Sequence, residues 1–394
     1  MIRPVMATLI IVALLAWPVG AAASPPAVPL PSEPGFTATL RPLLEAKMKA
    51  LRVPGAVVFV QVPGKGTWQA TLGTANLDID TPMRLDGHFR VGSITKTFTG
   101  TVILQLVDER KLGLDDPVAK YQPDAPNGAN ITIRDLLNMT SGLYNYSEDR
   151  GFNEQLDAEP GKVWDPKELL AIAFQHPPYF APGKGFHYSN TNTVLLGLII
   201  EQITGQPVAN AFQARIFKPL GMTHTLLPKR NSAAIPDPHP EGYMFGTNVE
   251  SLESTLLTGE QAAKADAAAG APHDVTHVNP SWAWTAGAAI STLHDLQIWA
   301  KALATGTLLS PAMQQQRLRW IAAGSGPNAA RYGLAIVDFN GLLGHDGQLP
   351  GFHSFMAYQP EKQATIVVLT NLYASPAGAE PSNELAKIII EHIQ

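Results

Sequence analysis

Residues 90–100 read R-V-G-S-I-T-K-T-F-T-G, and they place a serine and a lysine three positions apart where an extended segment becomes helical. Residues at positions i and i+3 share one face of a helix, so Ser93 and Lys96 are expected to point into one pocket. A neutral lysine amine there could accept the serine proton, and the unpaired N–H groups at a helix start favour developing negative charge. The stretch predicts acyl-transfer chemistry, although about one S-x-x-K spacing is expected by chance in a chain of this composition.

The composition of the chain indicates a folded protein with a large core. Of its 394 residues, 45% are hydrophobic and only 15% are charged, which suits one elaborate domain or two smaller ones. The net charge is −5 and no basic run occurs, so a nucleic-acid partner is not expected and a small-molecule or peptide substrate is. The absence of cysteine excludes disulfides, thiol catalysis and a cysteine-linked lipid anchor.

The first residues have the features of a signal peptide, which we assign to residues 1–23. Arg3 supplies the positive start, residues 5–17 are mostly apolar, and three alanines at 21–23 provide a cleavage site. An apolar run of about a dozen residues is too short to span a bilayer of about 30 Å as a helix. We therefore expect a secreted or periplasmic, cell-wall-associated protein with no stable membrane anchor after signal removal.

The pattern of the remaining chain predicts an α+β fold. A proline-rich linker is expected at 24–35, an α/β sheet domain at 36–114 and 281–394, and a mainly helical domain at 115–280. Within the latter, 248–280 is alanine-rich with little apolar periodicity, and we interpret it as a surface excursion of uncertain structure. The expected elements of the sheet domain are terminal helices at 37–51 and 382–392, a hairpin at 56–72, and strands at 332–338, 341–345, 352–358 and 364–369.

Tyr188-Ser189-Asn190 is a candidate partner of Ser93, placed just before a predicted helix. A tyrosine hydroxyl can pass a proton between the serine, the lysine and a leaving group, and the asparagine amide can hold a substrate carbonyl or the lysine. A core tyrosine beside a helix-capping asparagine is the alternative interpretation.

His345-Asp346-Gly347 is a second candidate, at the end of a short apolar strand. The glycine would let a substrate approach the backbone, and the N–H of Gln348 could join that of Ser93 in an oxyanion hole. A simple strand-ending turn is the alternative, since D-G is a strong turn dipeptide. No metal-binding motif, phosphate loop or G-x-S-x-G elbow is found, so no metal or other cofactor is expected.

The three motifs, in this order, resemble those of the serine β-lactamase and penicillin-binding protein superfamily. The flanking stretches L-L-N-M-T-S-G-L-Y-N-Y, A-P-G-K-G-F-H-Y-S-N-T-N and I-F-K-P-L-G-M are similar to the class C β-lactamase and Streptomyces-type D-alanyl-D-alanine carboxypeptidase branch. The resemblance implies a β-lactamase/transpeptidase-like fold, with an antiparallel sheet flanked by terminal helices plus a helical domain. It implies catalytic roles for Ser93 as nucleophile, Lys96 as general base and Tyr188 as proton relay, and substrate contacts for Asn190 and His345.

Two departures from the family pattern concern substrates that end in a carboxylate. Asp346 stands where the family usually has threonine or serine, and a carboxylate there would repel a substrate carboxylate at about 4 Å by ~1 to 4 kcal/mol. That repulsion weakens if Asp346 points away from the pocket. The family's carboxypeptidases also use an arginine from the preceding strand, whereas residues 332–340 contain neither arginine nor lysine and Arg331 is the nearest candidate.

The sequence thus predicts an exported serine hydrolase that works through an acyl-enzyme. D-alanyl-D-alanine carboxypeptidase, β-lactamase and esterase activities stay open, with a peptidoglycan fragment, a β-lactam or an ester as substrate. The substrate-binding residues are predicted to be Asn190, His345, Asp346, Gly347 and Gln348. The alternative is a catalytically weak penicillin-binding-like protein that binds peptidoglycan fragments or a partner through the same cleft.

Overall fold

The structure is a computed structural model that describes residues 35–253, 256–324 and 329–393. The predicted signal peptide, and the predicted linker apart from residue 35, lie outside the described residues. The residues from Gly35 onward belong to one compact unit. In the described ranges, no helix has both the length and the apolar character needed to cross a membrane.

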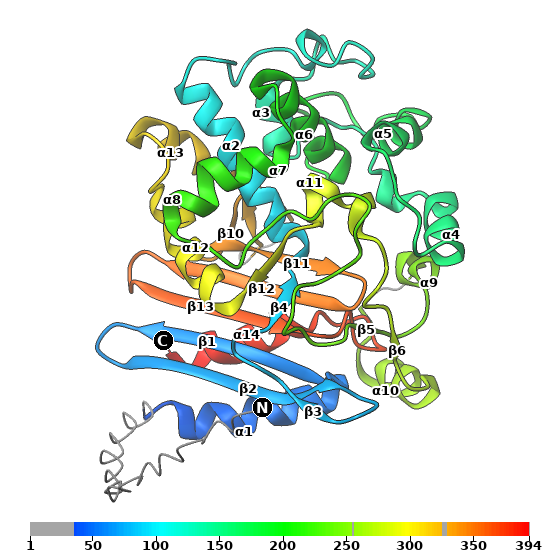
Figure 1. The fold of residues 1–394 in the computed structure, drawn as a ribbon, viewed down its shortest axis with the longest axis vertical. Helices are drawn as coiled ribbons and strands as arrows, with labels where there is room; N and C mark the ends of the chain where they lie inside the picture. Colours follow the sequence, from blue (N-terminus) through cyan, green and yellow to red (C-terminus); the bar gives the residue numbers. More distant parts are fainter. Residues whose placement is uncertain (1–34, 254–255, 325–328, 394) are drawn as a thin grey trace, which may run out of the picture. The chain divides into compact units, whose positions relative to one another are not determined.

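An antiparallel sheet, built from both ends of the chain, organises this unit (Figure 1). Its N-terminal strand β1 (Gly55–Val62) pairs with the C-terminal strand β13 (Ala364–Thr370), so that Val58 lies opposite Val368. Among the described residues the strand order is β3-β2-β1-β13-β12-β11-β10-β9-β8. The other strands are β2 (Gly66–Asn76), β3 (Thr81–Pro82), β8 (Ile321–Ala322), β9 (Arg331–Tyr332), β10 (Val337–Phe339), β11 (Leu342–Leu349) and β12 (Phe352–Gln359).

Each face of the sheet is covered by helices, because alternate strand residues point to opposite sides. The terminal helices α1 (Thr37–Leu51) and α14 (Pro381–Ile393) cover the face that carries Val58 and Val368. On the other face, α12 (Leu293–Thr305) packs its Trp299 into the core cluster that contains Val57 and Val367. The predicted α+β architecture, an antiparallel sheet with terminal helices on it, is confirmed.

The helical part of the chain lies between the two sheet-forming parts (Figure 1). Its central helix α2 (Thr95–Asp108) is buried on nearly every side. The hydroxyls of its threonines form hydrogen bonds with nearby backbone carbonyls; Thr97, for example, donates to the carbonyl of Ile94 at 2.6 Å. The other helices are α3 (Ile133–Leu137), α4 (Arg150–Ala158), α5 (Pro166–Phe174), α6 (Asn190–Thr204), α7 (Val208–Phe212), α8 (Lys218–Leu220), α9 (Asn248–Glu253), α10 (Gly259–Ala268), α11 (Trp284–Gly287) and α13 (Pro311–Arg317).

Two short ladders complete the fold: β4 (His88–Arg90) pairs with β7 (Ile290–Thr292), and β5 (Tyr243–Met244) pairs with β6 (His273–Asp274). The segment 248–280, interpreted from its composition as a surface excursion of uncertain structure, contains α9, α10 and β6. All residues of α10 are described and none of them is buried, so this helix contributes little to the core.

The predicted strand at 332–338 is wrong in its middle. The chain leaves the sheet after β9 and returns at β10, and the intervening turn is closed by the N–H of Gly333 donating to Ile336 at 2.8 Å. The N–H groups of Leu334 and Ala335 donate instead to the carbonyls of Arg317 and Leu137. Because these backbone groups are satisfied by the helical part of the chain, a continuous strand does not form.

Replacing Ile389 with alanine tests the packing of α14 on the sheet. Ile389 is 0% exposed in the cluster under α14, so the Ile389→Ala substitution is expected to lower the free energy of unfolding by about 2–5 kcal/mol. Urea unfolding measures the change, with Glu391→Ala on the exposed side of the same helix as the control. Equal losses in the two variants would contradict the packing described here.

Candidate active site

Ser93 lies in a 3₁₀ turn (Gly92–Ile94) that leads directly into α2. The turn is tied down by the N–H of Val91, which donates to Ala289 at 3.0 Å, and by the hydroxyl of Thr95, which donates to Gly92 at 2.7 Å. Gly92 has a φ of +51°, and a Cβ there would lie 2.5 Å from the nitrogen of Gln348. Only glycine fits this turn, and Ser93 itself remains partly exposed.

Lys96 is 0% exposed, and its amine is held by three oxygens. The Nζ atom lies 3.0 Å from Ser93 Oγ, 2.6 Å from Asn190 Oδ1 and 2.8 Å from the carbonyl oxygen of Ala286. Burial lowers the pKa of Lys96 well below its usual value, and the negative charge of Asp346 opposes this shift without cancelling it. The serine and lysine predicted to share a pocket are therefore in direct contact.

Tyr188 covers this pair from the start of α6. Lys96 Nζ lies 4.6 Å from the centre of the Tyr188 ring. Burial raises the pKa of Tyr188 well above its usual value, and Tyr332 adds to the effect, while Ser93 acts in the opposite direction. The phenol hydroxyl is buried and makes no hydrogen bond of good geometry with the described residues. A protonated phenol beside Ser93 is thus available to a bound molecule.

Asn190, the first residue of α6, is held by a loop that the sequence motifs did not mark. Its side-chain amide donates to Ser147 Oγ at 2.9 Å, and its backbone N–H donates to Asn145 Oδ1 at 3.0 Å. The Ser147 hydroxyl in turn donates to Asn145 Oδ1 at 3.0 Å. These bonds turn the Asn190 oxygen toward Lys96. Neither residue carries a pattern of its own: Asn145 lies in the stretch 136–146 that resembles the family, and Ser147 directly follows that stretch.

His345 lies on β11, and its 1% exposed ring is anchored at both nitrogens. Nε2 lies 3.1 Å from the hydroxyl of Tyr332, and Nδ1 lies 2.6 Å from the carbonyl oxygen of Asp346. The ring centre is 6.2 Å from that of Tyr188. Tyr332 therefore belongs to the site, although sequence reasoning treated it only as a strand residue.

Alternation along β11 divides the predicted substrate-binding residues between two faces of the sheet. His345 is opposite Met356 and Gly347 is opposite Ser354, whereas Asp346 is opposite Phe355, which packs under α14. Accordingly, the Asp346 carboxylate accepts a hydrogen bond from Asn383 of α14 at 2.8 Å. The side chain of Asp346 points away from Ser93, the arrangement in which its repulsion of a substrate carboxylate weakens.

Gly347 and Gln348 approach Ser93 through their backbones. A Cβ on Gly347 would lie 2.1 Å from the carbonyl oxygen of Val91 and 2.8 Å from the nitrogen of Ser93. The side chain of Gln348 is turned aside, since its amide donates to the carbonyl of Tyr373 at 3.1 Å. The backbones of the serine turn and of β11 are therefore in contact where the oxyanion hole was predicted.

Arg331, the nearest candidate for gripping a carboxylate, is engaged elsewhere. It forms an ion pair with Asp338 across the β9–β10 turn, in which two guanidinium nitrogens contact the same carboxylate oxygen, Oδ2, and the bond from Nε measures 2.9 Å. Its guanidinium also lies 5.7 Å from the centre of the Trp320 ring. The Arg331 side chain is 55% exposed, so a substrate carboxylate that recruited it would compete with Asp338 for the guanidinium.

Comparison with known sequences places the chain in a family. The beta-lactamase family profile matches residues 40–389. Protein flp from Staphylococcus aureus (strain MRSA252) is 27% identical over 360 residues, which span 89% of this chain and 64% of flp, so the chain covers less than two thirds of that relative. Esterase EstB from Burkholderia gladioli is 33% identical over 230 residues, or 55% of this chain and 58% of EstB.

Solved structures agree with this result. A D-stereospecific amidohydrolase from Streptomyces sp. superposes with a TM-score of 0.75 at 33% identity, covering 90% of this chain and 97% of its own. The D-amino acid amidase from Ochrobactrum anthropi SV3, complexed with L-phenylalanine amide, gives a TM-score of 0.75 at 27% identity, covering 91% and 98%. The profile spans most of the chain and includes all three predicted motifs, and on that basis this protein belongs to the beta-lactamase family, within the superfamily of serine hydrolases.

Proposed function

We propose that this protein hydrolyses an amide or ester bond of a small molecule through an acyl-enzyme formed on Ser93. The observation that carries the proposal is the buried Lys96 amine, which lies 3.0 Å from Ser93 Oγ and has a lowered pKa. A lysine in this state is able to take the serine proton at neutral pH.

The three neighbours of Lys96 suit a neutral amine. Such an amine has two N–H donors and one lone pair. The oxygens of Asn190 and Ala286 can only accept, so they take the two donors, and the lone pair is left for the Ser93 hydroxyl. Proton transfer from Ser93 to Lys96 then leaves an alkoxide that attacks the substrate carbonyl.

The developing oxyanion is proposed to bind to the N–H groups of Ser93 and Gln348. Their backbones are pressed together by the Gly92 and Gly347 contacts, and Ser93 N also begins the turn before α2. Donors held in place before the reaction cost no reorganisation when the charge appears, which is the main source of their effect on rate.

Tyr188 is proposed to protonate the leaving group. Because its pKa is raised, it stays a phenol at neutral pH and is suited to donate a proton rather than to act as the base. Lys96, 4.6 Å from the ring centre, can resupply that proton after expulsion of the leaving amine or alcohol. A water molecule then attacks the ester carbonyl, with the same groups serving in reverse order.

The proposed substrates are small amides and esters without a carboxylate next to the scissile bond, with D-amino acid amides as the first candidates. One observation supports this choice over carboxypeptidase or β-lactamase substrates: Arg331, the nearest candidate for binding a carboxylate, is paired with Asp338. The likeness to a D-amino acid amidase and to an esterase points the same way. Export, expected from residues 1–23, is part of the proposal.

Replacing Ser93 with alanine is expected to lower hydrolysis by at least about 10³-fold, because the nucleophile is lost. The assay panel contains D- and L-phenylalanine amide, short p-nitrophenyl esters, a chromogenic cephalosporin and a D-Ala-D-Ala peptide. Mass spectrometry of the quenched reaction should detect an acyl adduct on the wild-type protein and none on Ser93→Ala.

Three outcomes of this panel would contradict the proposal or part of it. Undiminished turnover by Ser93→Ala would show that Ser93 is not the nucleophile. Absence of both turnover and adduct with every substrate would favour the binding-protein alternative, and rapid turnover of the D-Ala-D-Ala peptide alone would overturn the substrate preference.

The activity should rise with pH as Lys96 loses its proton. Since burial lowers the Lys96 pKa, the midpoint of this rise is expected well below the ordinary lysine value, with kcat/KM falling about tenfold for each pH unit on the acidic side. The pH profile of p-nitrophenyl acetate hydrolysis measures it, since this substrate does not itself titrate. A midpoint near pH 10 would show that Lys96 keeps an ordinary pKa and is not the neutral base proposed here.

The Gly347→Ala substitution tests the oxyanion hole. The new methyl group would overlap the Val91 carbonyl and push β11 away from Ser93, so kcat/KM is expected to fall by about 10²-fold, with a loss of stability of about 1–3 kcal/mol. Gly161→Ala is the control, because a Cβ at Gly161 meets no described atom within 4 Å. Wild-type kinetics in Gly347→Ala would rule out the proposed contact.

A further inference from the structure

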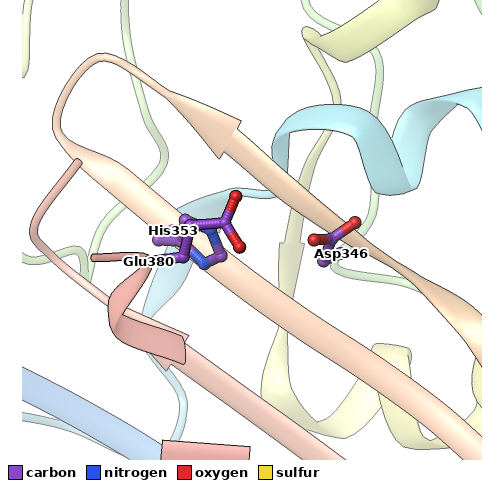
Figure 2. Close-up of side chains that lie close together, drawn as sticks. All are labelled: Asp346, His353 and Glu380. Atoms are coloured by element: carbon purple, nitrogen blue, oxygen red, sulfur yellow. The ribbon is translucent and has the colours of Figure 1, made fainter. Parts of the chain in front are cut away.

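On the face of β11 that is turned away from Ser93, three side chains from separate segments of the chain come together. Figure 2 shows Asp346, His353 and Glu380, from β11, β12 and the segment just before α14. Each offers one ligand atom, and these atoms all lie within 4.8 Å of one another. We propose that Asp346, His353 and Glu380 bind one divalent transition-metal cation on the α14 face of the sheet. The proposal does not depend on the proposed function.

The imidazole of His353 is the observation that sets this group apart from a chance cluster of acids. Its side chain is buried, at 2% exposure, yet its Nδ1 atom finds no hydrogen-bond partner in the described part of the chain. A buried polar atom without a partner is costly unless something else satisfies it. Burial lowers the pKa of His353 to about 4 against the opposing charge of Asp346, so the ring is neutral at pH 7, the form that binds metals.

Asn383 adds a second unsatisfied atom beside the same group. Its amide nitrogen donates to Asp346 at 2.8 Å and to Glu380 at 2.6 Å, which brings the two carboxylates together. Its side-chain oxygen is buried and has no partner among the described residues. An amide oxygen is an acceptable ligand for a divalent cation, but Asn383 presents its nitrogen to the two carboxylates, so its amide would have to turn over to supply a fourth ligand.

The charges of the group also favour a cation. Two carboxylates that share one amide donor repel each other, and an ion of charge +2 between them would reverse that repulsion.

One nitrogen and two or three oxygens suit Zn²⁺ or Mn²⁺ better than Ca²⁺ or Mg²⁺, which prefer oxygen alone. Ligands about 2.1 Å from a common ion are about 3.4 Å apart in a tetrahedral site and at most about 4.2 Å apart on opposite sides of the ion, so atoms as far apart as 4.8 Å would have to close by at least about 0.6 Å. Glu380 is exposed, and the Asp346 side chain is 29% exposed, which leaves an entry path and freedom for that movement.

A bound cation would join three elements of the fold. Asp346 lies between His345 and Gly347 on β11, His353 lies on β12, and Glu380 comes just before α14. Because Asp346 faces away from Ser93, the ion would touch neither Ser93 nor a substrate bound to it. Its effect would be to stabilise the strand that carries the third motif.

The test uses the full chain without an affinity tag, stripped with EDTA and exchanged into buffer. Titration calorimetry with ZnCl₂ and with MnCl₂ is expected to show one equivalent bound by at least one of the two ions, with an accompanying rise in Tm. Glu380→Gln and His353→Gln should each weaken that binding at least tenfold and abolish the rise in Tm. Glu391→Gln, which makes the same charge change on an exposed residue of α14, should behave as wild type.

Anomalous diffraction at the metal edge then locates the ion. A peak between Asp346, His353 and Glu380 is the expected result. The proposal is overturned if neither ion binds stoichiometrically, if Glu380→Gln binds as tightly as wild type, or if the peak lies at other histidines. Because Glu380 is exposed, its glutamine variant should fold even if His353→Gln does not.

Discussion

The site depends on a backbone contact between two segments that are about 250 residues apart in sequence: the serine turn and β11. Glycine at 92 and at 347 allows these backbones to touch, and the contact leaves no space for a Cβ on either side. The hydroxyl of Ser354 donates to the Val91 carbonyl at 2.9 Å and stabilises the same contact from β12. The position of Ser93 relative to the third motif is therefore set by the sheet rather than by the helices around it.

Burial of Lys96 is the second constraint, and it is unfavourable for stability by itself. An unfolded chain would keep this amine protonated at neutral pH, whereas the fold holds it in a place that disfavours the charge. The oxygens of Asn190 and Ala286 reduce the cost by accepting its two N–H groups. A group that lowers stability and is kept in hydrogen-bond contact with a serine is typical of a functional site.

Much of the fold was predictable because its signals are local. The leucine spacing of 37–51, the turn at 63–66 and the β-branched runs near the C-terminus each match the observed element. The interrupted strand at 332–338 was not predictable, because Arg317 and Leu137, far away in sequence, take its backbone hydrogen bonds. For the same reason the contacts that Asn145, Ser147 and Tyr332 make in the site could not be predicted from the sequence and are seen only in the structure. The direction of Asp346 was accessible in principle, since alternation along a strand turns it away once His345 faces Tyr332.

The pairing of β1 with β13 has a consequence for how the chain folds. The centre of the sheet cannot form until residues near 370 have been synthesised. Until then the N-terminal hairpin has one unpaired edge, on β1. Contacts of such long sequence separation make folding slow and let little of the native sheet form during synthesis. Loss of even the last two strands would leave β1 without its neighbour, and what remained would be an aggregation-prone hairpin rather than a smaller version of the same protein.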